Sequence, residues 1–124
     1  MLHIDYRSGE ALYIQIKQNL KRLILTGSLK EDEPIPSVRK LAGEFAINVN
    51  TVQRAYRELE QEGYIYSIPG KGNFVSKVNE DIFEKNLEEI KGELITVLEH
   101  AKSLDVSREK ILKIVEEYFK WTVN

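Results

Sequence analysis

Residues 37–63 read SVRKLAGEFAINVNTVQRAYRELEQEG, and this stretch decides the fold. Ser37 is a favourable N-cap for a helix of two to three turns, and Asn48 is a favourable N-cap for the helix that follows. The second helix is expected to stop at Gly63, because glycine just after a periodic segment is a common end signal. The loop between the two helices spans only about residues 46–47. Two short helices joined this tightly predict a helix-turn-helix.

The segments on either side complete a small domain. Apolar residues recur at helical spacing over residues 11–26, which predicts a first helix, while the two prolines within 30–36 exclude a helix there. After the helix-turn-helix the period changes to two, so residues 64–68 and 73–78 are expected to be strands. A glycine-rich hairpin turn at 69–72 joins them. The predicted fold class is mainly α with a small antiparallel β wing, a winged helix-turn-helix.

The remainder of the chain carries an apolar seam. From about Glu80 the apolar residues step by four and three positions over about three heptads, as in a helix that packs against another helix. The seam consists of Phe83, Leu87, Ile90, Leu94, Val97, Ala101 and Leu104. A last helix, capped by Ser107, is lined by Ile111, Leu112, Val115, Tyr118 and Phe119. We therefore expect a winged helix-turn-helix domain over 1–78 and a short, two-helix dimerisation or effector region over 79–124.

Composition narrows the class of protein. An apolar fraction of 42% and a charged fraction of 31% are typical of a globular chain, and the longest apolar runs are too short to span a bilayer. Residues 1–78 carry 11 Lys/Arg against 9 Asp/Glu, a net charge of +2, whereas residues 79–124 carry 7 against 11, a net charge of −4. This asymmetry is compatible with one DNA-facing end.

Enzyme chemistry is poorly supported by the sequence. The chain has no cysteine, and His3 and His100 are isolated from other metal-ligand residues, so we expect no metal, cofactor or catalytic site. The N-terminal residues lack the layout of a signal peptide, which favours a cytoplasmic protein.

Three motifs resemble the GntR-type family of bacterial transcription regulators. Residues 35–42 (IPSVRKLA) look like the proline-serine-x-arginine signature that opens that family's second helix. Residues 48–65 look like its recognition helix and the start of its wing, and residues 70–75 look like its wing tip. The match covers about residues 10–78. The short two-helix tail is similar to the YtrA-like branch, whose members are often associated with genes for membrane transporters.

Two departures from the family pattern concern loops and base reading. Glu31-Asp32 stands where many relatives have a proline-glycine turn, which leaves the conformation of that loop open. Val49 stands where many relatives carry arginine or another base-reading residue, which puts one expected base contact in question.

The resemblance implies double-stranded operator DNA as the partner. The first turn of a recognition helix reaches base edges in the major groove, and here that turn offers Asn, Gln, Thr and Val side chains without arginine. Asn and Gln pair well with adenine, so an A·T-leaning core is expected. For Asn48, helix capping and DNA contact are both open. The predicted DNA-binding residues are Ser37, Arg39, Asn48, Val49, Asn50, Thr51, Gln53, Arg54, Lys71 and Gly72.

A homodimer is the expected assembly, because one module of this size makes few DNA contacts and operator half-sites lie ~34 Å apart. The predicted dimerisation residues are Phe83, Leu87, Ile90, Leu94, Val97, Ala101, Val115 and Tyr118. An intrachain helical hairpin is the alternative. Aromatic residues Tyr118, Phe119 and Trp121 at the end of the chain indicate helix-end packing or, alternatively, a small-molecule effector site at the dimer interface.

These observations predict a dimeric transcription regulator, most simply a repressor that occludes a promoter. The alternative function is a winged-helix protein-interaction adaptor. An adaptor would more naturally present an apolar patch where this sequence places a polar helix turn and a basic wing tip.

Overall fold

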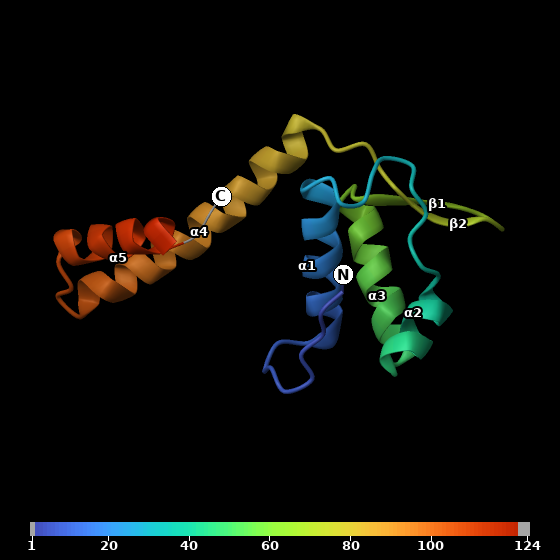
Figure 1. Ribbon diagram of the computed structural model, residues 1–124, viewed down its shortest axis with the longest axis horizontal. Helices are drawn as coiled ribbons and strands as arrows, with labels where there is room; N and C mark the ends of the chain where they lie inside the picture. Colours follow the sequence, from blue (N-terminus) through green and yellow to red (C-terminus); the bar gives the residue numbers. More distant parts are fainter. Residues whose placement is uncertain (1, 122–124) are drawn as a thin grey trace. The chain divides into compact units, whose positions relative to one another are not determined.

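The computed structural model describes residues 2–121 and contains five helices and two strands in the order expected (Figure 1). The elements are α1 (Leu12–Leu25), α2 (Val38–Phe45), α3 (Val49–Gln61), β1 (Ile65–Ile68), β2 (Gly72–Val75), α4 (Glu80–Ser103) and α5 (Arg108–Trp121). The predicted helix-turn-helix and wing are confirmed, with each strand starting or ending a few residues from its predicted bounds. The chain divides into two compact units, Met1–Phe83 and Glu84–Asn124, so the division falls inside α4.

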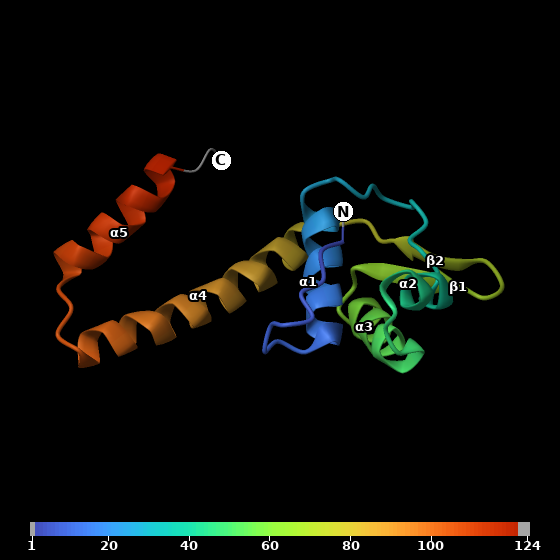
Figure 2. The same cartoon turned by 60° about the horizontal axis from the view of Figure 1, so that its bottom comes forward.

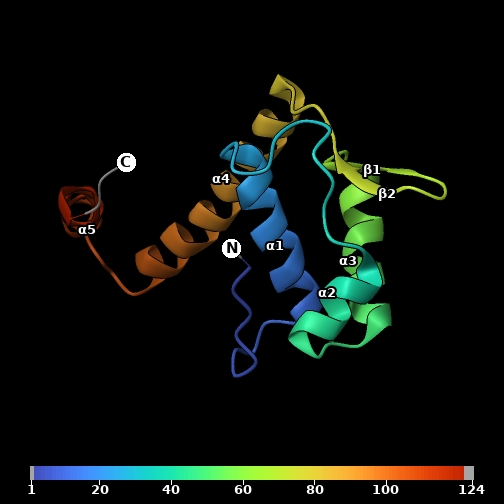
Figure 3. The ribbon, with the colours of Figure 1, turned by 45° about the vertical axis from the view of Figure 1, so that its right-hand side comes forward.

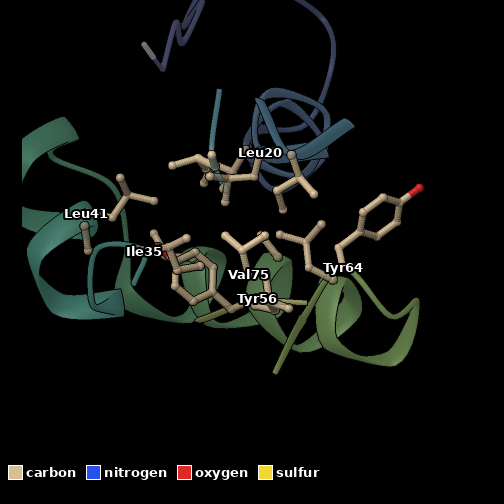
Figure 4. Close-up of a cluster of buried hydrophobic side chains, with 14 of the residues drawn as sticks. Leu20, Ile35, Leu41, Tyr56, Tyr64 and Val75 are labelled. Atoms are coloured by element: carbon tan, nitrogen blue, oxygen red, sulfur yellow. The ribbon is translucent and has the colours of Figure 1, made fainter. Parts of the chain in front are cut away.

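The core of the first unit lies between α1, α2, α3 and the sheet (Figure 4). Helix α3 contributes a stripe at positions i, i+3, i+4 and i+7, formed by Val52, Ala55, Tyr56 and Leu59, and each of these residues is at most 2% exposed. Helix α1 presents Ile16, Leu20 and Ile24 at the same kind of spacing. Burial of such side chains stabilises the fold by roughly 1.5–3 kcal/mol each, and it fixes α3 with its opposite face outward.

The wing is an antiparallel hairpin with Ile65 opposite Val75 and Ile68 opposite Gly72. The loop before α2 adds a third, strand-like segment that the sequence did not predict. Asp32 N donates to Val75 O at 2.8 Å, Val75 N to Glu33 O at 2.9 Å, and Ile35 N to Asn73 O at 3.0 Å. Two prolines exclude a helix at this segment, but they leave its extended backbone free to pair with the edge of β2.

The loop conformation left open by Glu31-Asp32 is now defined. Asp32 has a φ of 65°, the left-handed region that glycine would adopt in a proline-glycine turn. Aspartate tolerates this region better than most residues, and its carboxylate accepts a hydrogen bond of 2.6 Å from the Tyr66 hydroxyl. The loop therefore turns at Asp32 with a positive φ although no glycine stands there, and Glu33 N closes the turn on Lys30 O at 3.0 Å.

Side-chain amides hold the segment before α1. Gln15 and Asn19, one turn apart on α1 and both buried, each exchange two hydrogen bonds with the backbone of one residue in this segment. Gln15 bonds the amide and carbonyl of Asp5 at 2.8 and 3.0 Å, and Asn19 bonds those of His3 at 3.1 and 3.0 Å. The two amides imitate a strand partner, so the buried polar groups of both sides are satisfied.

The second unit exposes its apolar side chains. No residue of α4 or α5 is buried, and α5 leaves the connecting turn at an angle to α4 (Figure 2). Ser107 caps α5 as predicted, since its hydroxyl accepts from Lys110 N at 3.2 Å. Among residues 2–121, no helix combines the length and the apolar character needed to cross a membrane.

Candidate nucleic-acid interface

Both caps of the helix-turn-helix are formed as predicted. The Ser37 hydroxyl accepts from Lys40 N at 3.1 Å at the start of α2, and Asn48 Oδ1 accepts from Asn50 N at 2.7 Å at the start of α3. Between them Ala46 turns the chain with a φ of 51°, and Ile47 N bonds the carbonyl of Ala42 at 2.9 Å. This tight turn, with Ile47 buried, sets the angle at which α3 leaves α2.

The leading turn of α3 is exposed to solvent. Asn48, Val49, Asn50 and Gln53 are all exposed, with Val49 at 46%, and Thr51 is half-buried. Figure 3 shows this end of α3 beside α2, with the wing extending from near the other end of the helix. An exposed, uncharged helix turn with amide side chains has the shape and the donors and acceptors needed to read base edges in a major groove.

The wing side of α3 forms a cleft of about 380 Å³ that contains a predicted base reader. Gln53 and Arg57 line the cleft from α3, and Asn73 lines it from the wing. The wing is tied to α3 at this cleft, because Glu60 Oε2 accepts from both the amide and the hydroxyl of Ser67 at 3.1 and 2.9 Å. The position of the wing relative to the recognition helix is therefore fixed by side chains as well as by the core.

Two cations predicted to contact DNA are free of ion pairs. Arg39, on the first turn of α2, is exposed and makes no salt bridge with any described carboxylate. Lys71 is exposed at the wing tip, where its amide donates to Ile68 O at 2.9 Å. Gly70 and Gly72 flank it with φ values of 78° and 121°, so both glycines are required by the turn itself.

Arg54 differs from the other two predicted cations, Arg39 and Lys71, because its guanidinium is already engaged. Its guanidinium lies 3.7 Å from the centroid of the Tyr13 ring and donates to the Tyr13 hydroxyl at 3.0 Å. It also donates to Glu58 Oε2 at 3.0 Å. About half of the Arg54 side chain stays exposed, so the residue is held in place without being covered.

Further along the same face, ion pairs join α1 to α3. Lys17 Nζ lies 2.8 Å from Glu58 Oε1 and 2.6 Å from Glu62 Oε2, and Lys21 Nζ lies 2.8 Å from Glu62 Oε1. Burial alone would lower the pKa of Lys17 and raise that of Glu62, but the hydrogen bonds between the partners outweigh it. The pKa of Lys17 is raised and the pKa of Glu62 is lowered, and hydrogen bonds from Lys17 and Arg54 lower the pKa of Glu58.

Sequence reasoning missed Tyr13 and this set of ion pairs. The signal was present as charges spaced four residues apart, Lys17 and Lys21 on one helix and Glu58 and Glu62 on another. The pairing of the two helices could not be foreseen from the spacing. In the part of the chain that the structure describes, no group of three or more His, Asp or Glu residues is placed to hold a metal ion.

An exposed recognition helix, a capped tight turn and a wing fixed beside the helix define a winged helix-turn-helix DNA-binding protein. Comparison with known proteins supports the same class of protein. The family model described as "Bacterial regulatory proteins, gntR family" matches residues 12–75. The chain belongs to the GntR family of transcription regulators, as its motifs indicated.

Similar proteins extend the match beyond the DNA-binding domain. The HTH-type transcriptional repressor YtrA of Bacillus subtilis is 37% identical over 118 residues, which cover 94% of this chain and 91% of YtrA. A crystal structure of a transcriptional antiterminator from Listeria monocytogenes superposes with a TM-score of 0.77 and 34% identity, covering 95% of this chain and 89% of that one. The resemblance to the YtrA-like branch therefore includes the two-helix tail.

A second solved structure contains DNA. The DNA-binding domain of AraR in complex with its operator ORE1 superposes with a TM-score of 0.53 and 27% identity, covering 61% of this chain and all of that chain. The family assignment favours DNA binding over the adaptor function. The individual contact residues in this chain stay predictions.

Proposed function

We propose that this protein is a dimeric repressor that binds a dyad-symmetric operator in the cytoplasm, with transporter genes as the targets that the YtrA-like resemblance implies. The observation that carries the proposal is the exposed leading turn of α3, which presents Asn50 and Gln53 beside a fixed wing. Other predicted contact residues lie in this turn, at the start of α2 and on the wing tip. They are Val49 and Thr51 in the turn, Ser37 and Arg39 at the start of α2, and Lys71 and Gly72 on the wing tip.

The operator can be found by selecting bound fragments from a random duplex pool. We expect the selected sites to have dyad symmetry and A·T-rich half-sites, because the leading turn offers amides and no arginine. Asn50→Ala and Gln53→Ala should each weaken binding to the selected duplex by roughly 1–3 kcal/mol and change binding to random duplex little. Lys71→Ala should weaken binding to both duplexes alike, as expected for a backbone contact. Equal losses on both duplexes for the amide variants would show that they do not read bases.

The dimer is proposed from the uncovered apolar surface of α4 and α5. In the predicted seam Phe83, Leu87, Ile90, Leu94 and Val97 are 51–61% exposed, and on α5 Val115 and Tyr118 are 43% and 60% exposed. The intrachain hairpin does not remove this surface from water, since no residue of either helix is buried. An apolar surface of this extent is rare on a monomer and typical of an interface.

A groove in the second unit supports a second copy of this chain as the covering partner. Leu94, Leu98 and Ala101 of α4 line it together with Ile111 and Val115 of α5, and its volume is about 500 Å³. Ala101 is half-buried at its wall, in agreement with a place in the interface. Helices that leave such a groove open can accept a further helix as in a bundle.

Leu94→Asp tests the dimer, because it places a carboxylate at the centre of the seam. We expect sedimentation equilibrium to give monomers and operator affinity to fall. Lys91→Asp, one turn earlier on α4 and outside the seam, is the matched control and should remain dimeric. A Leu94→Asp protein that sediments as a stable dimer would contradict the proposal.

For regulation, we propose the aromatic end of α5 as the contact for a small-molecule effector at the dimer interface. Tyr118 and Phe119 are exposed and pack edge to face with centroids 5.3 Å apart, and Trp121 is 84% exposed. Trp121 fluorescence should respond to any compound that changes operator binding. Operator binding that responds while Trp121 does not would show that these aromatic residues only pack.

A further inference from the structure

Three rungs of side chains cross between α1 and α3 in one register. Tyr13 bonds Arg54, Lys17 bonds Glu58, and Lys21 bonds Glu62. The residue numbers rise by four on both helices from rung to rung, as they must when two helices run side by side in the same direction (Figure 1). Two further ion pairs connect these three contacts into one row of charges: Arg54–Glu58, one turn apart along α3, and Lys17–Glu62, which crosses diagonally from α1.

The charges along this row of ion pairs alternate in sign, and the cations outnumber the anions. The order is Lys21, Glu62, Lys17, Glu58, Arg54, so three cations enclose two anions and a cation stands at each end. Lys21 is buried at one end, with a side-chain exposure of 7%, whereas Arg54 at the other end is 52% exposed. An anion placed against Arg54 would continue the alternation.

Donors remain free at this exposed end. Arg54 has five N–H groups, of which one is directed to Glu58 and one to Tyr13. The Tyr13 hydroxyl accepts from Arg54, so its own proton is available, and no described residue accepts it. An arginine fixed by an aromatic ring and beside a free hydroxyl donor matches the acceptor oxygens of a phosphate.

The location fits the DNA backbone. Arg54 follows Asn50 by one helical turn and lies on the flank of the exposed face of α3 that borders α1, whereas Gln53 lines the cleft on the flank that borders the wing. A helix in a major groove ~12 Å wide lies between two phosphate backbones. If the flank of α3 that borders the wing contacts one phosphate backbone, the flank that borders α1 contacts the other.

We propose that Tyr13 and Arg54 form a phosphate-binding pair that anchors α1 to the DNA backbone across the groove from the wing. Tyr13 is a contact residue that the sequence motifs did not single out, and the lysine–glutamate rungs position it by holding α1 in register with α3. The inference rests on the proposed DNA binding and adds the contact made by α1.

The test replaces one phosphate at a time with an uncharged methylphosphonate in the duplex selected from the random pool. For the wild-type dimer, we expect, besides any phosphate that Lys71 contacts, one phosphate per half-site whose replacement weakens binding roughly tenfold. Tyr13→Phe, which keeps the ring, and Arg54→Gln should each bind the unmodified duplex roughly tenfold more weakly and lose sensitivity at that same phosphate. Arg54→Lys keeps the charge and should retain the slope of log K against log salt, whereas Arg54→Gln should lower it by about 0.9 per subunit.

Arg22→Gln is the matched control, since Arg22 is an exposed arginine at the far end of α1 whose guanidinium bonds Asn19. It should leave the methylphosphonate profile unchanged. Profiles of Tyr13→Phe and Arg54→Gln that match the wild-type profile at every phosphate would overturn the phosphate pair while leaving DNA binding intact. A wild-type protein that selects no duplex would overturn the proposed function and this inference together.

Discussion

Asn48 is the residue at which a structural and a functional role can be separated by substitution. Its side chain accepts a hydrogen bond of 2.7 Å from Asn50 N and caps α3, and it is also exposed at the leading end of the recognition helix. Removal of the cap in Asn48→Ala leaves an unsatisfied amide in the first turn of α3. Serine and aspartate can both accept the same hydrogen bond, so Asn48→Ser and Asn48→Asp keep the cap. Both substitutions change the side-chain group that is exposed to DNA at this position.

The expected magnitude follows from the cap geometry. Asn48→Ala should lower the free energy of unfolding by about 1 kcal/mol, within the 0.5–2 kcal/mol observed for such caps. Asn48→Ser should be close to neutral, and Asn48→Asp neutral or slightly stabilising, because its carboxylate lies at the positive end of the α3 dipole. For a unit of this size, 1 kcal/mol corresponds to a shift of roughly 4–8 °C in Tm.

The assay combines thermal unfolding with operator affinity at one protein concentration, since the Tm of a dimer depends on concentration. If Asn48 only caps, Asn48→Ser should unfold and bind operator as the wild type does. If Asn48 also contacts bases, Asn48→Ser and Asn48→Asp should lose operator affinity without losing stability. Asn48→Ser destabilised as much as Asn48→Ala would refute the capping argument.

Three further outcomes are expected. The pKa of Glu62 is below its ordinary value of 4.5, so its contribution to stability is present above pH 4.5 and lost as the pH falls through the folded-state pKa. Glu62→Gln should therefore flatten the decline of Tm measured from pH 6 to pH 3. Ala46→Gly should stabilise the fold by up to about 1 kcal/mol in urea titrations, because glycine adopts the φ of 51° without strain. Leu59→Ala, at 0% exposure, should lower the unfolding free energy by about 2–5 kcal/mol, and a smaller loss would mean that the site collapses around the cavity.

Much of the DNA-binding domain follows from local sequence rules. Ser37, Asn48 and Ser107 were predicted as N-caps and form caps, because a cap depends on two or three neighbouring residues. The hairpin turn at the wing tip was predicted from its two glycines, which adopt positive φ. These features depend on short-range geometry, and the apolar periodicity then selects the buried face of each helix.

Contacts between distant segments could not be predicted in this way. The pairing of residues 32–35 with β2 joins positions about forty residues apart, and neither segment has an alternating pattern long enough to reveal the other. The Arg54 side chain was predicted as a DNA contact from its place in the recognition helix, but its engagement by Tyr13 depends on how α1 packs against α3. No local rule relates those two residues.

The amino-acid sequence by itself determined the elements, their caps and turns, the membership in the GntR family and the apolar stripe of each helix, because these depend on neighbouring residues and on a recurring motif. Tertiary structure alone decided which helix faces which, and therefore which cations are neutralised and which remain available to DNA. The physical reason is that hydrogen bonds and ion pairs between α1 and α3 form only at distances near 3 Å, which the packing of the core sets.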